Sequence, residues 1–329
     1  MKFKGLFLIL TVFLFSFIAC NAVSAAGHTV VWQDNRDGVG SSHLYYKNSG
    51  TGTGGRVSDV NSNQEDPSIS GNTVVWMDNR DSGSNWHIYY KNIETGKGGR
   101  VTNTDSNQDY PIISGNTVVW QDNRDGNDHI YYRNLVSGTG GRVSSIDSIQ
   151  SEPRISENTV VWQDNRDGIN LHIYYKNLET GKGGRISSID SFQGFSRISG
   201  NIVVWMDNRD VTKNHVYFKN LETGKGGRIS DIDSYQQEPG ISGNIVVWMD
   251  DRDVTNNHLY YKNLETGKGG RVSLTDSYQY NPSISGNTVV WSDNRDGGSN
   301  FHIFSKNLAN GTLARVSSKD SYQWNSVIN

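Results

Sequence analysis

Short apolar runs separated by polar turns recur along the chain from residue 28 to residue 329. A Val-Val-Trp run followed by an acidic loop occurs seven times, with its tryptophan at positions 32, 76, 120, 162, 205, 248 and 291. Successive tryptophans are therefore 42 to 44 residues apart. A repeat of about 40–45 residues is the size of one four-stranded blade of a β-propeller.

The unit over residues 67–104 shows four strand segments. Residues 67–70, 73–77, 87–91 and 100–102 are rich in β-branched and aromatic residues, and Gly, Asn and Asp fill the turns between them. Beyond the first 25 residues no segment has the 3.6-residue spacing of a helix, which argues against helical solenoids of similar period. Each unit is thus predicted to be one four-stranded antiparallel blade.

The two ends of the repeat region complement each other. Residues 28–32 match the second strand of a unit without a first strand before them, and residues 323–329 match the first strand at 64–70 without a second strand after them. The last strand can therefore complete the first blade, which removes the open edge of the array. We predict an all-β, seven-bladed β-propeller of four-stranded antiparallel blades, closed by its C-terminal strand.

The repeat resembles a known family. The run Asp-Pro-Ser-Ile-Ser-Gly-Asn-Thr-Val-Val-Trp-Met-Asp-Asn-Arg-Asp at 66–81, with His-Ile-Tyr-Tyr at 87–90, is similar to the TolB-type propeller repeat and to repeat proteins of archaeal and bacterial cell surfaces. The resemblance covers residues 28–329, although Ser-Gly-Asn stands where that family usually has Ser-Pro-Asp-Gly. It implies the fold, whereas propellers as a class perform many different functions.

Residues 1–25 are predicted to be a signal peptide, followed by a propeller domain over 26–329. Lys2 and Lys4 precede the apolar run Leu6–Ala19, and small residues end at Ala25. We therefore expect a secreted or cell-surface protein without a transmembrane span after the signal is removed. Periplasmic location, or a lipid anchor at Cys20, is the alternative. A net charge of −3 argues against nucleic acid as a partner.

Two polar residues recur in every unit beside the tryptophan. An aspartate such as Asp78 ends the second strand, and a histidine such as His87 begins the third. We interpret both as structural, with the aspartate accepting hydrogen bonds from the loop or from the facing imidazole. The tryptophans are expected to pack between blades: Trp32, Trp76, Trp120, Trp162, Trp205, Trp248 and Trp291. No metal site and no cofactor are predicted, and calcium in the Asp-Asn-Arg-Asp loops is the alternative.

The units differ most just before the proline of the first strand. These residues should surround one mouth of the central channel, here called the top, and are predicted to bind ligand: Asp66, Tyr110, Glu152, Arg154, Phe195, Arg197, Glu238, Asn281 and Trp324. The top also receives the acidic loops, whereas the bottom receives turns such as 179–185 with Lys182 and Arg185. We therefore expect an acidic top and a basic bottom.

These features favour an exported, monomeric binding module for an extracellular glycan, peptide or protein rather than an enzyme. No Ser or Cys nucleophile motif is present. The alternatives are a polysaccharide lyase or glycoside hydrolase, in which Glu152 and Glu238 act as acid and base and Arg154 or Arg197 holds a uronate, and a purely structural surface-layer protein.

Overall fold

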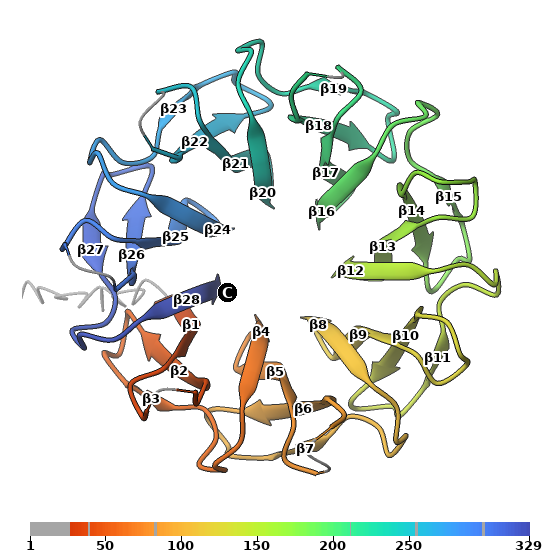
Figure 1. The fold of residues 1–329 in the computed structure, drawn as a ribbon, viewed down its shortest axis with the longest axis horizontal. Helices are drawn as coiled ribbons and strands as arrows, with labels where there is room; N and C mark the ends of the chain where they lie inside the picture. The colour runs from red at the N-terminus through yellow and green to blue at the C-terminus, as the bar shows by residue number, and fades with distance from the viewer. Residues whose placement is uncertain (1–26, 39, 82–83, 211, 254–255, 298–299) are drawn as a thin grey trace, which may run out of the picture.

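The computed structural model describes residues 27–38, 40–81, 84–210, 212–253, 256–297 and 300–329, and these form seven four-stranded antiparallel sheets around a central channel (Figure 1). The predicted signal peptide and Cys20 lie outside the described residues. Blades 2 to 7 each take four consecutive strands, from β4–β7 to β24–β27, and blade 1 has the order β28-β1-β2-β3. The predicted all-β, seven-bladed fold is confirmed.

The strands follow one pattern in every blade, with the first strand facing the channel and the fourth on the rim. Their bounds are β1 Thr29–Asp34, β2 His43–Asn48, β3 Gly54–Arg56, β4 Gln64–Ser70, β5 Thr73–Asp78, β6 His87–Asn92, β7 Gly98–Arg100, β8 Gln108–Ser114, β9 Thr117–Asp122, β10 His129–Asn134, β11 Gly140–Arg142, β12 Gln150–Ser156, β13 Thr159–Asp164, β14 His172–Asn177, β15 Gly183–Arg185, β16 Gln193–Ser199, β17 Ile202–Asp207, β18 His215–Asn220, β19 Gly226–Arg228, β20 Gln236–Ser242, β21 Ile245–Asp250, β22 His258–Asn263, β23 Gly269–Arg271, β24 Gln279–Ser285, β25 Thr288–Asp293, β26 His302–Asn307, β27 Leu313–Arg315 and β28 Gln323–Ile328.

Strand β28 closes the ring, as predicted. It pairs antiparallel with β1, with Val30 opposite Ile328 and Val31 opposite Val327 (Figure 1). The His28 Nδ1 and Asn329 O atoms lie 2.6 Å apart beyond the last strand pair. Blade 1 therefore has the same inner strand as the other six blades, and the sheet edge that faces the channel is complete around the ring.

The fourth strand lies two residues earlier than the sequence analysis placed it, at Gly98–Arg100 instead of 100–102. Gly98 pairs with Lys91, and a Cβ atom there would lie 2.4 Å from the Tyr90 carbonyl oxygen. Glycine therefore permits close strand pairing at residues for which the sequence predicts a turn. Val101 is still buried, and its N–H donates to the Ile88 carbonyl at 2.8 Å.

The core of the protein lies between blades. Trp120 of blade 3 packs with Val75, Met77 and Ile88 of blade 2 in one buried cluster, and the other blade junctions repeat this arrangement. Every repeat tryptophan is at most 3% exposed. Each blade thus buries its apolar face only against its neighbour, as in other repeat proteins.

A buried aspartate organises the top of each blade. In blade 3, Asp122 accepts hydrogen bonds from Trp120 Nε1 at 3.0 Å, from the Arg124 N–H at 2.9 Å and from Ser106 Oγ at 2.8 Å. The Arg124 guanidinium also pairs with Asp122 and lies 4.1 Å from the Tyr131 ring centroid. The carboxylate therefore joins the second strand, the loop after it and the connection that arrives from blade 2.

One turn carries a residue that its backbone disfavours. Glu157 has φ of 53°, whereas the equivalent turns use glycine with φ of 54° to 56°. We predict that Glu157→Gly stabilises the protein by about 0.5–1 kcal/mol, because relief of about 1–2 kcal/mol of left-handed strain exceeds the entropy that glycine adds to the unfolded chain. Urea denaturation measures the change. Gly115→Glu in blade 3 is the matched reverse variant and should lower stability, and equal stability of all three proteins would contradict the prediction.

Candidate ligand site in the central channel

A β-bulge in the innermost strand of every blade turns one side chain into the channel. The bulged residue has a positive φ between 47° and 53° in each case: Asp66, Tyr110, Glu152, Phe195, Glu238, Asn281 and Asn325. A proline follows in five of the seven blades, which an edge strand tolerates at a bulge. Seven different side chains are thus presented at one level by one repeated backbone device.

The channel contains a cavity of about 520 Å³. Eight of the nine residues predicted to bind ligand line it: Asp66, Tyr110, Glu152, Arg154, Phe195, Arg197, Glu238 and Asn281. The ninth, Trp324, does not line the cavity. It precedes the bulge and contacts Tyr322 at a ring distance of 5.2 Å, while Asn325 takes the equivalent place in the cavity.

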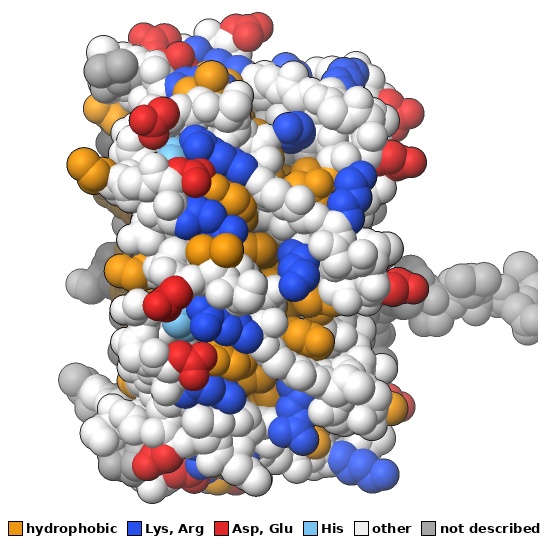
Figure 2. Space-filling view, turned by 90° about the vertical axis from the view of Figure 1, so that its right-hand side faces the viewer, with side chains coloured by type: hydrophobic (Ala, Val, Ile, Leu, Met, Phe, Trp, Pro, Cys, Tyr) orange, Lys and Arg blue, Asp and Glu red, His pale blue; other side chains and the backbone are white. Residues whose placement is uncertain are grey.

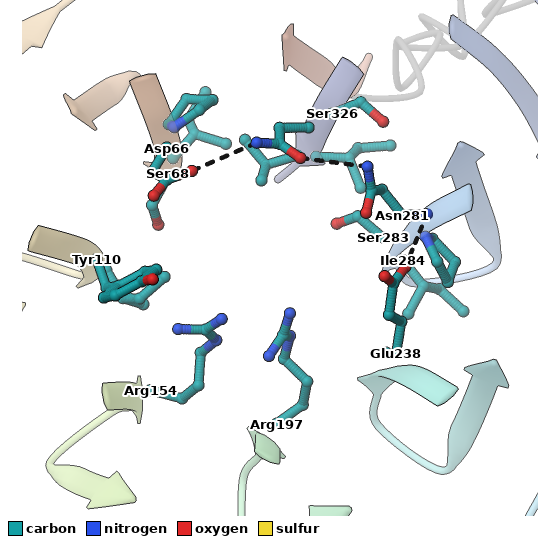
Figure 3. A pocket seen from close by; sticks show the side chains of 18 of the residues that line it. Asp66, Ser68, Tyr110, Arg154, Arg197, Glu238, Asn281, Ser283, Ile284 and Ser326 are labelled. Atoms are coloured by element: carbon teal, nitrogen blue, oxygen red, sulfur yellow. Dashed lines mark hydrogen bonds between the residues drawn. The ribbon is translucent and has the colours of Figure 1, made fainter. Parts of the chain in front are cut away.

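Arg154 and Arg197 extend side by side from β12 and β16 into the cavity (Figure 3). Each donates one hydrogen bond to a backbone carbonyl, Arg154 to Pro153 at 2.7 Å and Arg197 to Ser196 at 2.9 Å. Among the described residues no carboxylate lies within ion-pair distance of either guanidinium. Burial and the neighbouring Arg154 lower the pKa of Arg197 to about 9, which leaves this guanidinium cationic at neutral pH. Burial also lowers the pKa of Arg154.

The opposite wall is a chain of amides and carboxyls. The Asn281 N–H donates to Glu238 at 3.0 Å, Asn281 Nδ2 donates to Asn325 at 3.2 Å, and Asn325 Nδ2 donates to Asp66 at 3.3 Å (Figure 3). Burial raises the pKa of Asp66 and of Glu238. Glu152 is held apart from this chain, because it accepts a hydrogen bond of 2.6 Å from Gln163. The cavity therefore has a cationic wall facing hydrogen-bonding groups.

The repeated histidines lie in the hairpins, away from the cavity lining. His87 is buried, with Nδ1 3.4 Å from Asp81 and Nε2 3.5 Å from Asp105. Its carboxylate neighbours are thus the last acid of the loop and an acid of the next connection, and not Asp78, which the sequence offers as a partner of the imidazole. Burial lowers the pKa of His87. Within the described ranges, no three His, Cys, Asp or Glu side chains are grouped so that they could hold a metal ion.

The expected basic bottom face is wrong. Arg185 contacts Asp167 of a top loop at 3.0 Å, because its strand runs toward the top. On the bottom turns Lys182 is accompanied by Glu179, and both are exposed. Figure 2 shows acidic side chains along both edges of the disc and rows of Lys and Arg on the rim between them.

Two sets of residues that connect neighbouring blades were not predicted from the sequence. Gln108, fully buried at the start of β8, accepts from the Ile88 N–H of the preceding blade at 3.2 Å, and its equivalents are also fully buried. Lys91 Nζ donates to the Val57 carbonyl of the preceding blade at 2.8 Å. Both residue types recur at fixed places in the repeat, but that recurrence alone does not reveal a bond between blades.

Known proteins resemble this chain in structure. No family model and no curated protein matches it. TolB from Acinetobacter baumannii superimposes with a TM-score of 0.55 at 14% identity, over 93% of this chain and 67% of that one. The chain has a TolB-like propeller fold.

Other structures with this fold include enzymes. A puromycin-hydrolyzing peptidase of Mycobacterium tuberculosis matches with a TM-score of 0.66 at 11% identity, over 88% of this chain and 51% of that one. Oligogalacturonate lyase in complex with manganese matches with a TM-score of 0.60 at 12% identity, over 87% of this chain and 83% of that one. At these identities the likeness concerns the TolB-like fold alone. The described residues contain no helix long and apolar enough to cross a membrane.

One carboxyl in an inner strand of the TolB-like propeller, that of Asp109 in β8, should make its stability depend on pH. Burial, with repulsion from Asp128, Asp66 and Asp122, raises the pKa of Asp109 to about 6. The pKa of an aspartate in the unfolded chain is about 3.9, so the folded state binds this proton more tightly than the unfolded state does. The free energy of unfolding therefore falls as the pH rises from about 4 through about 6. We predict that Asp109→Asn leaves stability unchanged at pH 4 and raises it by about 1 kcal/mol at pH 7, after discounting for partial exposure.

Urea denaturation of wild type and Asp109→Asn at several pH values tests this dependence. Asp59→Asn, at an exposed position on the same face, is the control and should behave as wild type throughout. An equal stability difference at pH 4 and pH 7 would show that Asp109 does not titrate as described.

Proposed function

We propose that the protein is an exported, non-catalytic binding module that holds an acidic oligosaccharide by its carboxylate in the central channel. The observation that supports it is the pair of guanidinium groups of Arg154 and Arg197, which share one cavity wall without a carboxylate partner among the described residues. A planar guanidinium binds a carboxylate through two parallel hydrogen bonds, and burial strengthens such bonds.

A sugar acid suits the rest of the cavity better than an apolar ligand does. The wall opposite the arginines offers Asp66, Glu238, Asn281 and Asn325, whose oxygens and amides can bind hydroxyl groups. Tyr110 adds a phenol ring at the same level. A ligand whose carboxylate contacts the arginines would place its hydroxyl groups against these residues, which matches a uronic acid residue at the end of a chain.

Loss of both cations should abolish binding. We expect Arg154→Gln/Arg197→Gln to weaken binding of an oligouronate by about 100-fold or more, because each charged hydrogen bond contributes about 1.5–3 kcal/mol. Isothermal titration calorimetry with oligogalacturonates, oligomannuronates and the corresponding neutral oligosaccharides measures the loss. The matched control is Lys182→Gln/Lys225→Gln, which removes two exposed charges from the bottom turns of the same two blades.

Three results would contradict the proposal. Unchanged affinity in the arginine variant would move the site elsewhere, and capture of peptides but not oligouronates would replace the ligand class. The appearance of unsaturated or new reducing ends during incubation would make the protein a lyase or a hydrolase.

A further inference from the structure

Five aromatic rings form a continuous track on the top face of blades 7 and 1, outside the cavity. Successive ring centroids lie 6.2 Å apart for Tyr278 and Tyr280, 5.6 Å for Tyr280 and Phe301, 5.6 Å for Phe301 and Tyr322, and 5.2 Å for Tyr322 and Trp324. Tyr278 is 44% exposed and Tyr322 38% exposed, and the other three rings are half-buried. This aromatic track includes Trp324, which the channel does not use.

The scaffold does not require these rings. The positions equivalent to Tyr278 and Tyr322 hold Asn63 and Asn107 in blades 2 and 3, and the positions equivalent to Tyr280 and Trp324 hold Glu65 and Asp109. Those blades have the same strands and the same buried core. Aromatic rings at these positions are therefore not needed to form a blade.

Polar groups accompany the aromatic track. Tyr278 also lines a cleft of about 390 Å³, together with Asn256, Asn257, Ser234 and Asp251. Asn257 hydrogen-bonds the Tyr280 side chain. Ring faces next to amides, a hydroxyl and a carboxylate match a pyranose, which presents C–H groups on its faces and hydroxyl groups around its edge.

The acidic side chains beside the aromatic track disfavour an anionic occupant. Asp276 and Asp320 precede Tyr278 and Tyr322 by two residues and are 69% and 83% exposed in their side chains. In the cleft, Lys213 is 3.4 Å from Asp233, and Arg252 pairs with the buried Asp250. A membrane surface or a nucleic acid needs uncompensated Lys and Arg side chains. The aromatic track therefore favours an occupant without negative charge.

We propose that the aromatic track is a second binding site, which takes a neutral polysaccharide by stacking of its sugar faces on Tyr278, Tyr280, Tyr322 and Trp324. This site does not rest on the channel proposal, because none of its rings lines the cavity. A chain of several sugars can contact rings from both blades, whereas a disaccharide can contact only part of the track. Affinity should therefore rise with oligosaccharide length.

Calorimetry and affinity electrophoresis with neutral hexasaccharides and disaccharides of glucose, xylose, mannose and N-acetylglucosamine test the site on the full protein. We expect at least one hexasaccharide to bind, and Tyr278→Ala/Tyr322→Ala/Trp324→Ala to weaken it by 30-fold or more, at about threefold to tenfold for each ring. The matched control is Tyr235→Ala in blade 6, which removes a ring of 43% exposure at the equivalent position outside the track. Circular dichroism shows whether the triple variant remains folded. If it is unfolded, the single variants Tyr278→Ala and Tyr322→Ala, at exposed positions, replace it in the binding measurements.

Each contrary outcome overturns the proposal in a recognisable way. The track is not a glycan site if wild type binds no neutral hexasaccharide, or if the triple variant binds as well as Tyr235→Ala. Loss of neutral-sugar binding in Arg154→Gln/Arg197→Gln but not in the triple variant would place that sugar in the channel. A wild-type dimer that becomes monomeric in the triple variant, measured by analytical ultracentrifugation, would make the track a protein interface.

Discussion

A charged carboxylate sealed inside each blade is the interaction on which the rest of the propeller depends. Burial alone would raise the pKa of Asp122, but hydrogen bonds from Arg124, Trp120 and Ser106 outweigh it and hold the pKa below its usual value. A buried charge is costly unless every lone pair is satisfied, so the surrounding groups cannot move independently. One side chain thereby ties together a core tryptophan, a surface loop and the connection from the neighbouring blade, and the sevenfold repetition extends this constraint around the ring.

The positions proposed to bind ligand are those whose side-chain type this constraint does not restrict. The bulge in each inner strand fixes where a side chain enters the channel and leaves its chemistry open, so the same backbone carries a phenylalanine in one blade and an asparagine in another. Left-handed backbone at a non-glycine residue costs about 1–2 kcal/mol, and the sheet on either side supports it. Two arginines two residues beyond neighbouring bulges then place two guanidinium groups side by side in the cavity of a chain whose net charge is −3.

Much of this architecture could be predicted from the sequence, because period, blade number and ring closure are properties of the repeat. Six of the seven side chains that the bulges turn into the channel were also predictable, since residues that vary between equivalent positions mark the surface that the scaffold does not need. Trp324 lies outside the cavity because the bulge turns Asn325 inward, which has the same place in the repeat as the six bulged residues that were predicted. Arg185 was placed on the wrong face because Gly183 and Gly184 look like turn residues but belong to a strand that carries the arginine to the other side.

The pairing of β28 with β1 also orders events in time. Residues 323–328 are synthesised some 290 residues after Thr29–Asp34, so the channel-facing edge of β1 has no partner while the intervening blades emerge. The entropy lost in joining such distant segments grows only logarithmically with their separation, yet contacts this far apart slow folding. The first blade made is therefore the last to be completed, and until then its inner edge remains without a strand partner.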